Sequence, residues 1–207
     1  MDKKEIKEAF IKYVETQKEI PSWSYQFTDA LELDAGRFYD FYPSLSKMEV
    51  DIWKDMFNSL LRRLESEPSY QEYTAREKML AFYFTLIDIM SQRRVFITIL
   101  YKRLRLSVMP SFLKSFRAQY MDYVTDLIRQ AKSENEALSR PVVDEFYEYG
   151  LWWQCQFIIW FWTRDQSEGF ELTDAAIERA VHLSFDLMGP TPLDSLVSFA
   201  KFLYQSR

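Results

Sequence analysis

Apolar residues recur every three or four positions along most of this chain, which is the spacing that places side chains on one face of an α-helix. The clearest run consists of Leu113, Phe116, Tyr120, Val124, Leu127 and Ala131. The 207 residues include only 4 glycines and 7 prolines, whereas sheet-rich folds need many tight turns and usually more of both. The spacing and this scarcity together predict an all-α fold.

Prolines and capping residues divide the chain into expected helices. We expect helices over residues 2–18, 22–31, 34–42, 46–64, 70–91, 93–106, 110–131 and 141–162, followed by two C-terminal helices separated by Gly189-Pro190. Ser46 and Glu49 fit a capping box, and Thr173 fits the N-cap of the first C-terminal helix. We therefore place a head at residues 1–47, a connecting helix at 48–66 and a helical body at 67–207.

The residues that usually carry chemistry are scarce. The only histidine is His182, which excludes a multi-histidine metal site, and the only cysteine is Cys155, which excludes an internal disulfide framework. The sequence has neither a glycine-rich phosphate loop nor a Gly-x-Ser-x-Gly motif. We therefore expect neither an enzyme nor a bound cofactor or metal ion.

The chain also lacks the features of secreted and membrane-spanning proteins. Its first residues are charged, unlike those of a signal peptide, and its most apolar stretch, residues 149–162, is shorter than the roughly 20 residues that span a membrane. The net charge of −5 suits a soluble protein, and the lone thiol fits a reducing compartment. We therefore expect a cytoplasmic protein.

The segment at residues 34–44 resembles a known DNA-recognition helix. It reads Asp-Ala-Gly-Arg-Phe-Tyr-Asp-Phe-Tyr-Pro-Ser and includes the third of three short expected helices. The recognition helix of the TetR family of transcriptional regulators typically reads Ser-x-Gly-Thr-Leu-Tyr-x-Tyr-Phe, followed by Pro or Asn and then Ser. The same or similar residues stand here at seven positions: Gly36, Phe38, Tyr39, Phe41, Tyr42, Pro43 and Ser44.

This resemblance implies a TetR-like fold, with an N-terminal three-helix helix-turn-helix head and a C-terminal helical bundle. It implies a homodimeric regulator that binds DNA through the head and a small apolar or amphiphilic ligand in residues 67–207. The candidate DNA contacts are Arg37, Tyr39, Ser44 and Lys47, of which Arg37 could read a guanine edge and Tyr39 could bond a phosphate. The other interpretation is that Arg37 is a solvated surface residue and that the aromatic residues build the core of the head.

The charge of the head argues against tight DNA binding. Residues 1–65 contain 10 Lys and Arg against 13 Asp and Glu, a net charge of −3. Asp40 stands where TetR-like proteins often carry a polar or basic residue, and Lys47 comes later than the family spacing would place it. Because neutralisation of phosphate supplies much of the affinity for DNA, the alternative is a TetR-like protein that binds a lipid or a partner and has lost DNA binding.

In the body, the sequence offers candidates for two sites. Candidates for a ligand site are Phe82, Leu86, Tyr101, Phe116, Tyr120 and Trp153. Because TetR-like proteins dimerise through their last helices, candidates for the dimer interface come from the apolar stretch at 149–162: Trp152, Phe157, Trp160 and Phe161. Gln154 and Gln156 lie two residues apart and so on different helix faces, and we expect one of them to face a cavity or the interface.

A window without acidic residues runs from Ile89 to Tyr120. It contains seven basic residues: Arg93, Arg94, Lys102, Arg103, Arg105, Lys114 and Arg117. Basic side chains interleaved with apolar ones suit an anionic membrane surface, here through residues 93–117, an anionic ligand, or additional contact with DNA. The remaining interpretation is that they pair with acids elsewhere in the chain, such as those at residues 65–77 or 134–148.

Overall fold

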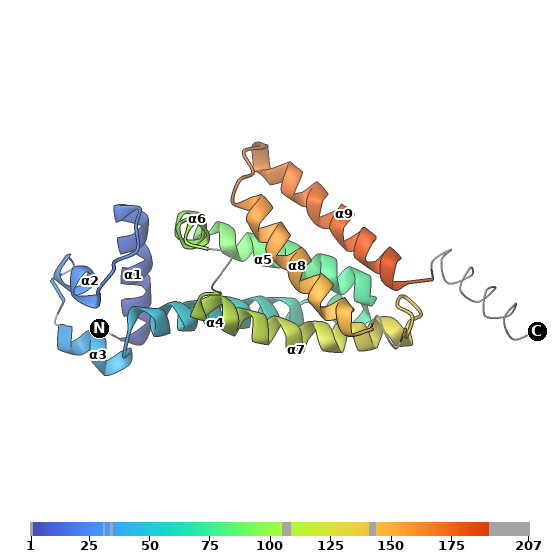
Figure 1. Cartoon of the computed structure of the whole chain (residues 1–207), viewed down its shortest axis with the longest axis horizontal. Helices are drawn as coiled ribbons and strands as arrows, with labels where there is room; N and C mark the ends of the chain where they lie inside the picture. The colour runs from blue at the N-terminus through green and yellow to red at the C-terminus, as the bar shows by residue number, and fades with distance from the viewer. Residues whose placement is uncertain (1, 31, 34, 105–108, 141–143, 191–207) are drawn as a thin grey trace, which may run out of the picture.

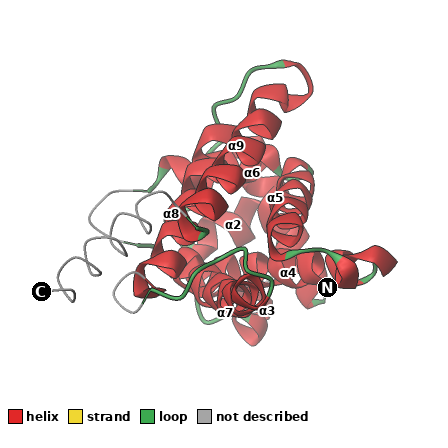
Figure 2. Ribbon diagram, turned by 90° about the vertical axis from the view of Figure 1, so that its right-hand side faces the viewer, coloured by secondary structure: helices red, strands yellow, loops and turns green. Residues whose placement is uncertain are grey.

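The computed structural model describes residues 2–30, 32–33, 35–104, 109–140 and 144–190. This part of the chain forms nine α-helices and two short 3₁₀ helices and contains no strand, which confirms the all-α prediction (Figures 1 and 2). The helices are α1 (Lys3–Gln17), α2 (Ser24–Ala30), α3 (Ala35–Phe41), α4 (Leu45–Glu65), α5 (Ala75–Ser91), α6 (Arg94–Lys102), α7 (Ser111–Ser133), α8 (Asp144–Trp162) and α9 (Glu171–Met188).

The head consists of α1, α2 and α3, which lie at one end of the elongated molecule (Figure 1). The first helix begins with a capping box: the Asp2 carboxylate accepts a hydrogen bond from the Glu5 amide at 2.8 Å, and the Glu5 carboxylate accepts one from the Asp2 amide at 2.6 Å. Aromatic rings fill the core, where Phe27 packs edge-to-face against both Phe10 and Phe38. This core joins all three helices.

The connecting helix α4 runs from the head into the body, where it packs along α7 (Figure 1). The hydroxyl of Ser44 caps it by accepting a hydrogen bond from the Lys47 amide at 3.3 Å. The capping box expected at Ser46 and Glu49 is therefore wrong. Ser44 already has the extended backbone that an N-cap requires, so the helix begins two residues earlier than expected.

The body packs α5, α7, α8 and α9 together, with α4 against α5 and α7 (Figure 2). The buried hydroxyls of Tyr83 and Tyr120 are hydrogen-bonded to each other at 2.7 Å, and Tyr120 also lies 2.9 Å from the carbonyl oxygen of Leu151 on α8. These bonds satisfy polar atoms that would be costly to bury without partners. They also hold α5, α7 and α8 together at one point.

Two helices of the body begin elsewhere than expected. The helix α5 follows Thr74, which forms a capping box with Glu77, and residues 68–72 form a 3₁₀ helix where the sequence predicted α-helix from residue 70. The helix α9 begins before Thr173, so the N-cap prediction for Thr173 is wrong. The amide and the hydroxyl of Thr173 instead donate hydrogen bonds to the buried Asp165 carboxylate, at 2.9 and 2.6 Å. The start expected at residue 141 and the last C-terminal helix lie outside the described residues.

Candidate functional site

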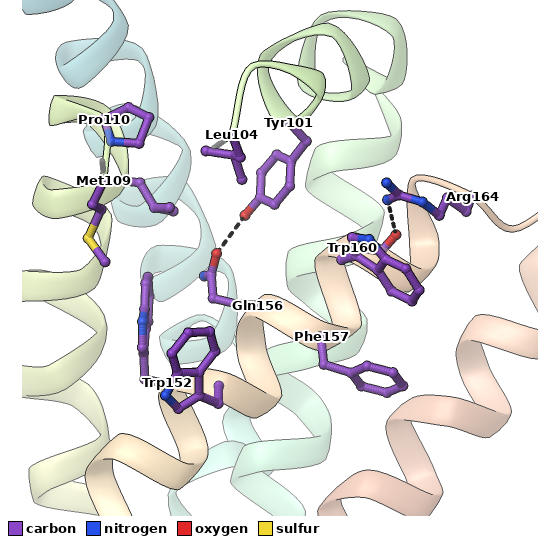
Figure 3. A pocket seen from close by; sticks show the side chains of 11 residues that line it. Tyr101, Leu104, Met109, Pro110, Trp152, Gln156, Phe157, Trp160 and Arg164 are labelled. Carbon is purple, nitrogen blue, oxygen red and sulfur yellow. Dashed lines mark hydrogen bonds between the residues drawn. The ribbon is translucent and has the colours of Figure 1, made fainter. Parts of the chain in front are cut away.

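A pocket opens in the body where the C-terminal end of α6, the N-terminal end of α7 and one face of α8 meet (Figure 3). Its volume is about 480 Å³, which lies in the range of sites for small molecules. Its walls are mainly aromatic and aliphatic: Tyr101, Leu104, Met109, Pro110, Leu113, Trp152, Trp153, Phe157 and Trp160. The remaining lining residues in the described part of the chain are Gln156 and Arg164.

The amide of Gln156 provides a polar group between these walls. Its oxygen accepts a hydrogen bond from the Tyr101 hydroxyl at 3.4 Å (Figure 3), and burial raises the pKa of that hydroxyl far above its usual range, so it remains a donor. The Gln156 Nε2 atom is buried and has no hydrogen-bond partner among the described residues. The expectation that one of Gln154 and Gln156 faces a cavity is confirmed for Gln156.

Arg164 supplies a positive charge at the end of the pocket near the C-terminus of α8 (Figure 3). Its guanidinium carbon lies 4.5 Å from the centre of the Trp160 ring, and its Nη1 donates to the Trp160 carbonyl oxygen at 3.2 Å. Lys102 and Lys114, on the helix ends that border the pocket, are both exposed. No acidic residue lines the pocket in the described part of the chain, so its polar end is positive.

The six residues expected to bind a ligand fall into two groups. Tyr101 and Trp153 line the pocket. The other four, Phe82, Leu86, Phe116 and Tyr120, are buried in the core and do not line it. Helical spacing identifies the apolar face of a helix but does not show where along that face a cavity opens, so core and lining residues were not separated from the sequence. The lining residues Leu104, Met109 and Pro110 were missed because they stand between α6 and α7.

The helices α8 and α9 each carry an exposed apolar stripe. The stripe on α8 includes Phe146, Trp153, Phe157 and Trp160, and the stripe on α9 includes Leu172, Leu183 and Leu187. Of the residues expected at a dimer interface, Phe157 and Trp160 lie in the α8 stripe and Phe161 is half-buried. Trp152 is only 3% exposed because it packs against Phe116 and Tyr120 of α7, so its expected place at the interface is corrected.

The N-terminal end of α6 contacts the head. Arg93, which precedes the helix, forms an ion pair with Glu8 of α1, and Phe96 packs edge-to-face against Phe10 of α1 with ring centres 6.0 Å apart. The interpretation that residues of the basic window pair with acids elsewhere in the chain therefore holds for Arg93, although its partner lies outside the two segments named as examples. The folded chain brings α1 closer to it than those segments, although α1 is far away in sequence.

The C-terminal end of α6 contacts α4. Arg103 forms an ion pair with the buried Glu49 at 2.9 Å, so it too pairs with an acid elsewhere in the chain, again outside the two segments named as examples. One turn further along α4 from Glu49, the ring of Trp53 lies 6.1 Å from the ring of Tyr101. Because Tyr101 also lines the pocket, a single side chain contacts both the pocket and the connecting helix.

Comparison with known families identifies the group of proteins to which these features belong. Residues 78–203, more than half of the chain, match the model described as the tetracyclin repressor-like, C-terminal domain. The chain belongs to the TetR family. A search of curated proteins and a search of solved structures find no match.

In this TetR-family protein the four candidate DNA contacts lie on α3 and at the start of α4. Arg37 and Lys47 are exposed, and Tyr39 is 56% exposed. The Tyr39 hydroxyl is hydrogen-bonded to the Ser24 hydroxyl of α2, and the Ser44 hydroxyl caps α4. Two of the four hydroxyl or cationic groups therefore already have partners within the head.

The cysteine and the histidine of this TetR-family protein have ordinary surroundings. Cys155 is buried, and burial raises the pKa of its thiol, which makes it unreactive. His182 is exposed on α9, with Nδ1 3.1 Å from Nη1 of Arg76. In the part of the chain that the structure describes, no group of three side chains could hold a metal ion, and no helix is long and apolar enough to cross a membrane.

Proposed function

We propose that this protein is a homodimeric transcriptional regulator that binds a small apolar or amphiphilic ligand in its pocket and binds DNA through its head. The observation that carries this proposal is the position of Tyr101, which lines the pocket and packs against Trp53 of α4. A ligand that displaces Tyr101 acts directly on the helix that carries the head. Since a ligand shifts an equilibrium only by binding one state more tightly, the ligand favours one placement of the head over another.

The exposed stripes on α8 and α9 support the dimer. Contiguous exposed apolar surface of this kind marks an interaction site, because a monomer gains nothing by presenting it to water. The double variant Leu183→Glu/Leu187→Glu should be monomeric in size-exclusion chromatography with light scattering, since it places two charges in the α9 stripe. Ala118→Glu, at an exposed position of α7, is the matched control and should leave the dimer intact.

The DNA-binding part of the proposal is tested by fluorescence anisotropy against the DNA upstream of the protein's own gene, at low and moderate salt, with random DNA as the control. If Arg37 reads a base, Arg37→Ala should lower the affinity roughly tenfold and relax sequence selectivity. Arg129→Ala is the matched control, because Arg129 is equally basic and exposed but lies on α7. Equal affinities for the two variants would rule out the assigned role of Arg37.

A second function is favoured by the ion pairs that lysines of the head form with acids of α4. Lys7 forms ion pairs with Asp51 and Asp55 of α4, and Lys3 also pairs with Asp51. Two basic groups of residues 1–65, a segment that already carries a net charge of −3, are thus bound by acids within the protein. The corresponding proposal is a TetR-like protein that binds a lipid or a partner and has lost DNA binding.

Vesicle flotation distinguishes the two functions. The second predicts that the protein floats with vesicles containing anionic phospholipid, that Lys102→Glu/Lys114→Glu abolishes flotation, and that no DNA is bound at low salt. Neutral vesicles provide the control for non-specific adsorption. Selective DNA binding without flotation supports the regulator and rules out the second function.

A further inference from the structure

The polar groups of the pocket restrict the kind of ligand it can hold. We propose that the ligand is a single-chain amphiphilic anion, with its apolar body against the aromatic walls, its acid group at Arg164 and an uncharged oxygen at Gln156. This inference rests on the proposed function of the pocket as a ligand site and names the class of molecule that the site takes.

The charge of the ligand follows from the residues that line the pocket. Arg164 is the one charged side chain among the described lining residues, and its guanidinium lies against the Trp160 ring with Nη1 directed to the Trp160 carbonyl and the Thr163 hydroxyl. A guanidinium has five N–H groups, so several remain for a carboxylate. The exposed Lys102 and Lys114 lie on the helix ends that border the pocket and add positive potential there, whereas a cationic ligand would meet no carboxylate in the described lining.

The uncharged oxygen follows from Gln156. Tyr101 donates to the oxygen of the Gln156 amide, which leaves the buried Nε2 as a donor without an acceptor in the described part of the chain. An unsatisfied buried donor destabilises a purely hydrocarbon complex, whereas a ligand hydroxyl, carbonyl or ether oxygen placed against it gains a hydrogen bond. A site built this way discriminates strongly against analogues that lack the oxygen.

The distance between the two polar groups sets the length of the ligand. Gln156 and Arg164 are eight residues apart along α8 and the turn that follows it, which corresponds to roughly 12 Å of backbone rise. The Arg164 guanidinium folds back to the Trp160 carbonyl, so the two polar groups are closer than this and roughly 12 Å is an upper limit. A chain of about ten carbons between an acid and a terminal oxygen is therefore the longest that fits this span, and a volume of about 480 Å³ accommodates one such chain.

Isothermal titration calorimetry with three probes of equal chain length tests the charge: decanoate, 1-decanol and decyltrimethylammonium. For the full-length wild type we expect decanoate to bind about tenfold more tightly than 1-decanol, and decyltrimethylammonium to bind most weakly. Arg164→Gln should remove the advantage of decanoate and leave the affinity for 1-decanol within about twofold. Arg129→Gln, at an exposed position of α7, is the matched control and should change neither affinity.

A second titration tests the oxygen at Gln156, with 10-hydroxydecanoate compared with decanoate. The wild type should bind the hydroxylated acid about tenfold more tightly, because its terminal hydroxyl reaches the Gln156 amide. In Gln156→Leu the order should reverse, since an apolar side chain favours the plain hydrocarbon end. Circular dichroism confirms that each variant retains its fold.

The outcomes separate this inference from the proposed function. If decyltrimethylammonium or 1-decanol binds as tightly as decanoate, the pocket is still a ligand site but the anionic class is wrong. If Arg164→Gln binds decanoate as wild type does, the assigned position of the acid group is wrong. If none of the probes binds, both the ligand class and the proposed ligand site fail.

Discussion

The head and the body of this protein are held together in different ways. The body has long helices around a continuous set of aromatic rings, in which Phe82 stacks on Tyr123 with ring centres 4.7 Å apart. The head has helices of 15, 7 and 7 residues, of which the two shorter ones cannot persist alone in water. Polar contacts join it to α4: the Tyr42 hydroxyl donates to Asp51 at 2.7 Å, and Lys7 pairs with the same carboxylate at 3.0 Å.

This difference shows that the head uses its charges for its own fold. Burial raises the pKa of Asp51, but hydrogen bonds from Tyr42, Lys7 and Lys3 outweigh it and lower that pKa to about 2. The carboxylate therefore stays ionised and keeps the two lysines engaged. A head of this kind gains stability from charges that a DNA-binding head would otherwise offer to phosphate.

The largest expected effect separates the two regions by their cores. Phe27 in the head and Phe82 in the body are both fully buried, and truncating either to alanine should cost about 3–5 kcal/mol. In Phe27→Ala this loss exceeds what so small a core can provide, so we expect α1–α3 to unfold while the body remains folded. In Phe82→Ala we expect the whole chain to unfold at a lower temperature.

Hydrogen exchange followed by mass spectrometry measures this comparison. Fast exchange confined to residues 3–41 in Phe27→Ala, with protection retained in α5 and α7, would support a head that depends on the body. Loss of protection in both regions at once would show that head and body unfold as one cooperative unit.

A second, intermediate effect concerns the polar contact that fixes α9 in the body. Burial raises the pKa of Asp165, but hydrogen bonds from Ser167 and Thr173 outweigh it and lower that pKa to about 2. A carboxylate with a lowered pKa stabilises the fold above its unfolded pKa of about 3.9, and this contribution is lost as the pH falls towards 2. Asp165→Asn should therefore cost about 2 kcal/mol at pH 7 and roughly half as much at pH 3.

Urea unfolding at pH 7 and pH 3 checks this prediction for Asp165. Asp126→Asn is the matched control, because Asp126 is exposed and only forms an i,i+3 ion pair on the surface of α7. A difference between wild type and Asp165→Asn that stays constant from pH 7 to pH 3 would mean that the ionised carboxylate is not what stabilises the start of α9.

The sequence predicted the helices better than the contacts between them. Local signals such as the helical spacing of apolar residues and the prolines between helices act within a few residues, so the order of the helices was readable from them. The N-cap of α9 was misassigned because Asp165 supplies the acceptor from eight residues before Thr173. The pairs Glu8–Arg93 and Glu49–Arg103 join residues 85 and 54 positions apart, and no local pattern specifies such pairs.

The candidate site was predicted in part for the same reason. Tyr101 and Trp153 were identified from aromatic content on helices of the body, and both line the pocket. Trp152 was assigned to the interface because it belongs to the apolar stretch at 149–162, but neighbouring residues on a helix, such as Trp152 and Trp153, point about 100° apart. Which of the two faces inward is decided by the packing of α8 on α7, where Trp152 contacts Tyr120.

The smallest effect concerns Glu49, which lies where the head and the body meet. Burial raises its pKa, and the ion pair with the half-exposed Arg103 offsets this only in part. A raised acid pKa means that Glu49 favours the fold at low pH and loses that contribution as the pH rises through its folded pKa. Glu49→Gln should therefore be slightly more stable than wild type at pH 7 and equal to it near pH 4, because Arg103 keeps its hydration when its partner is neutral.

Thermal melts at both pH values measure this difference in stability. Glu8→Gln is the control, because Glu8 forms a more exposed ion pair, with Arg93. A Glu49→Gln variant that melts below wild type at pH 7 would show that attraction to Arg103 outweighs the cost of burial, and that this ion pair strengthens the contact between α4 and α6.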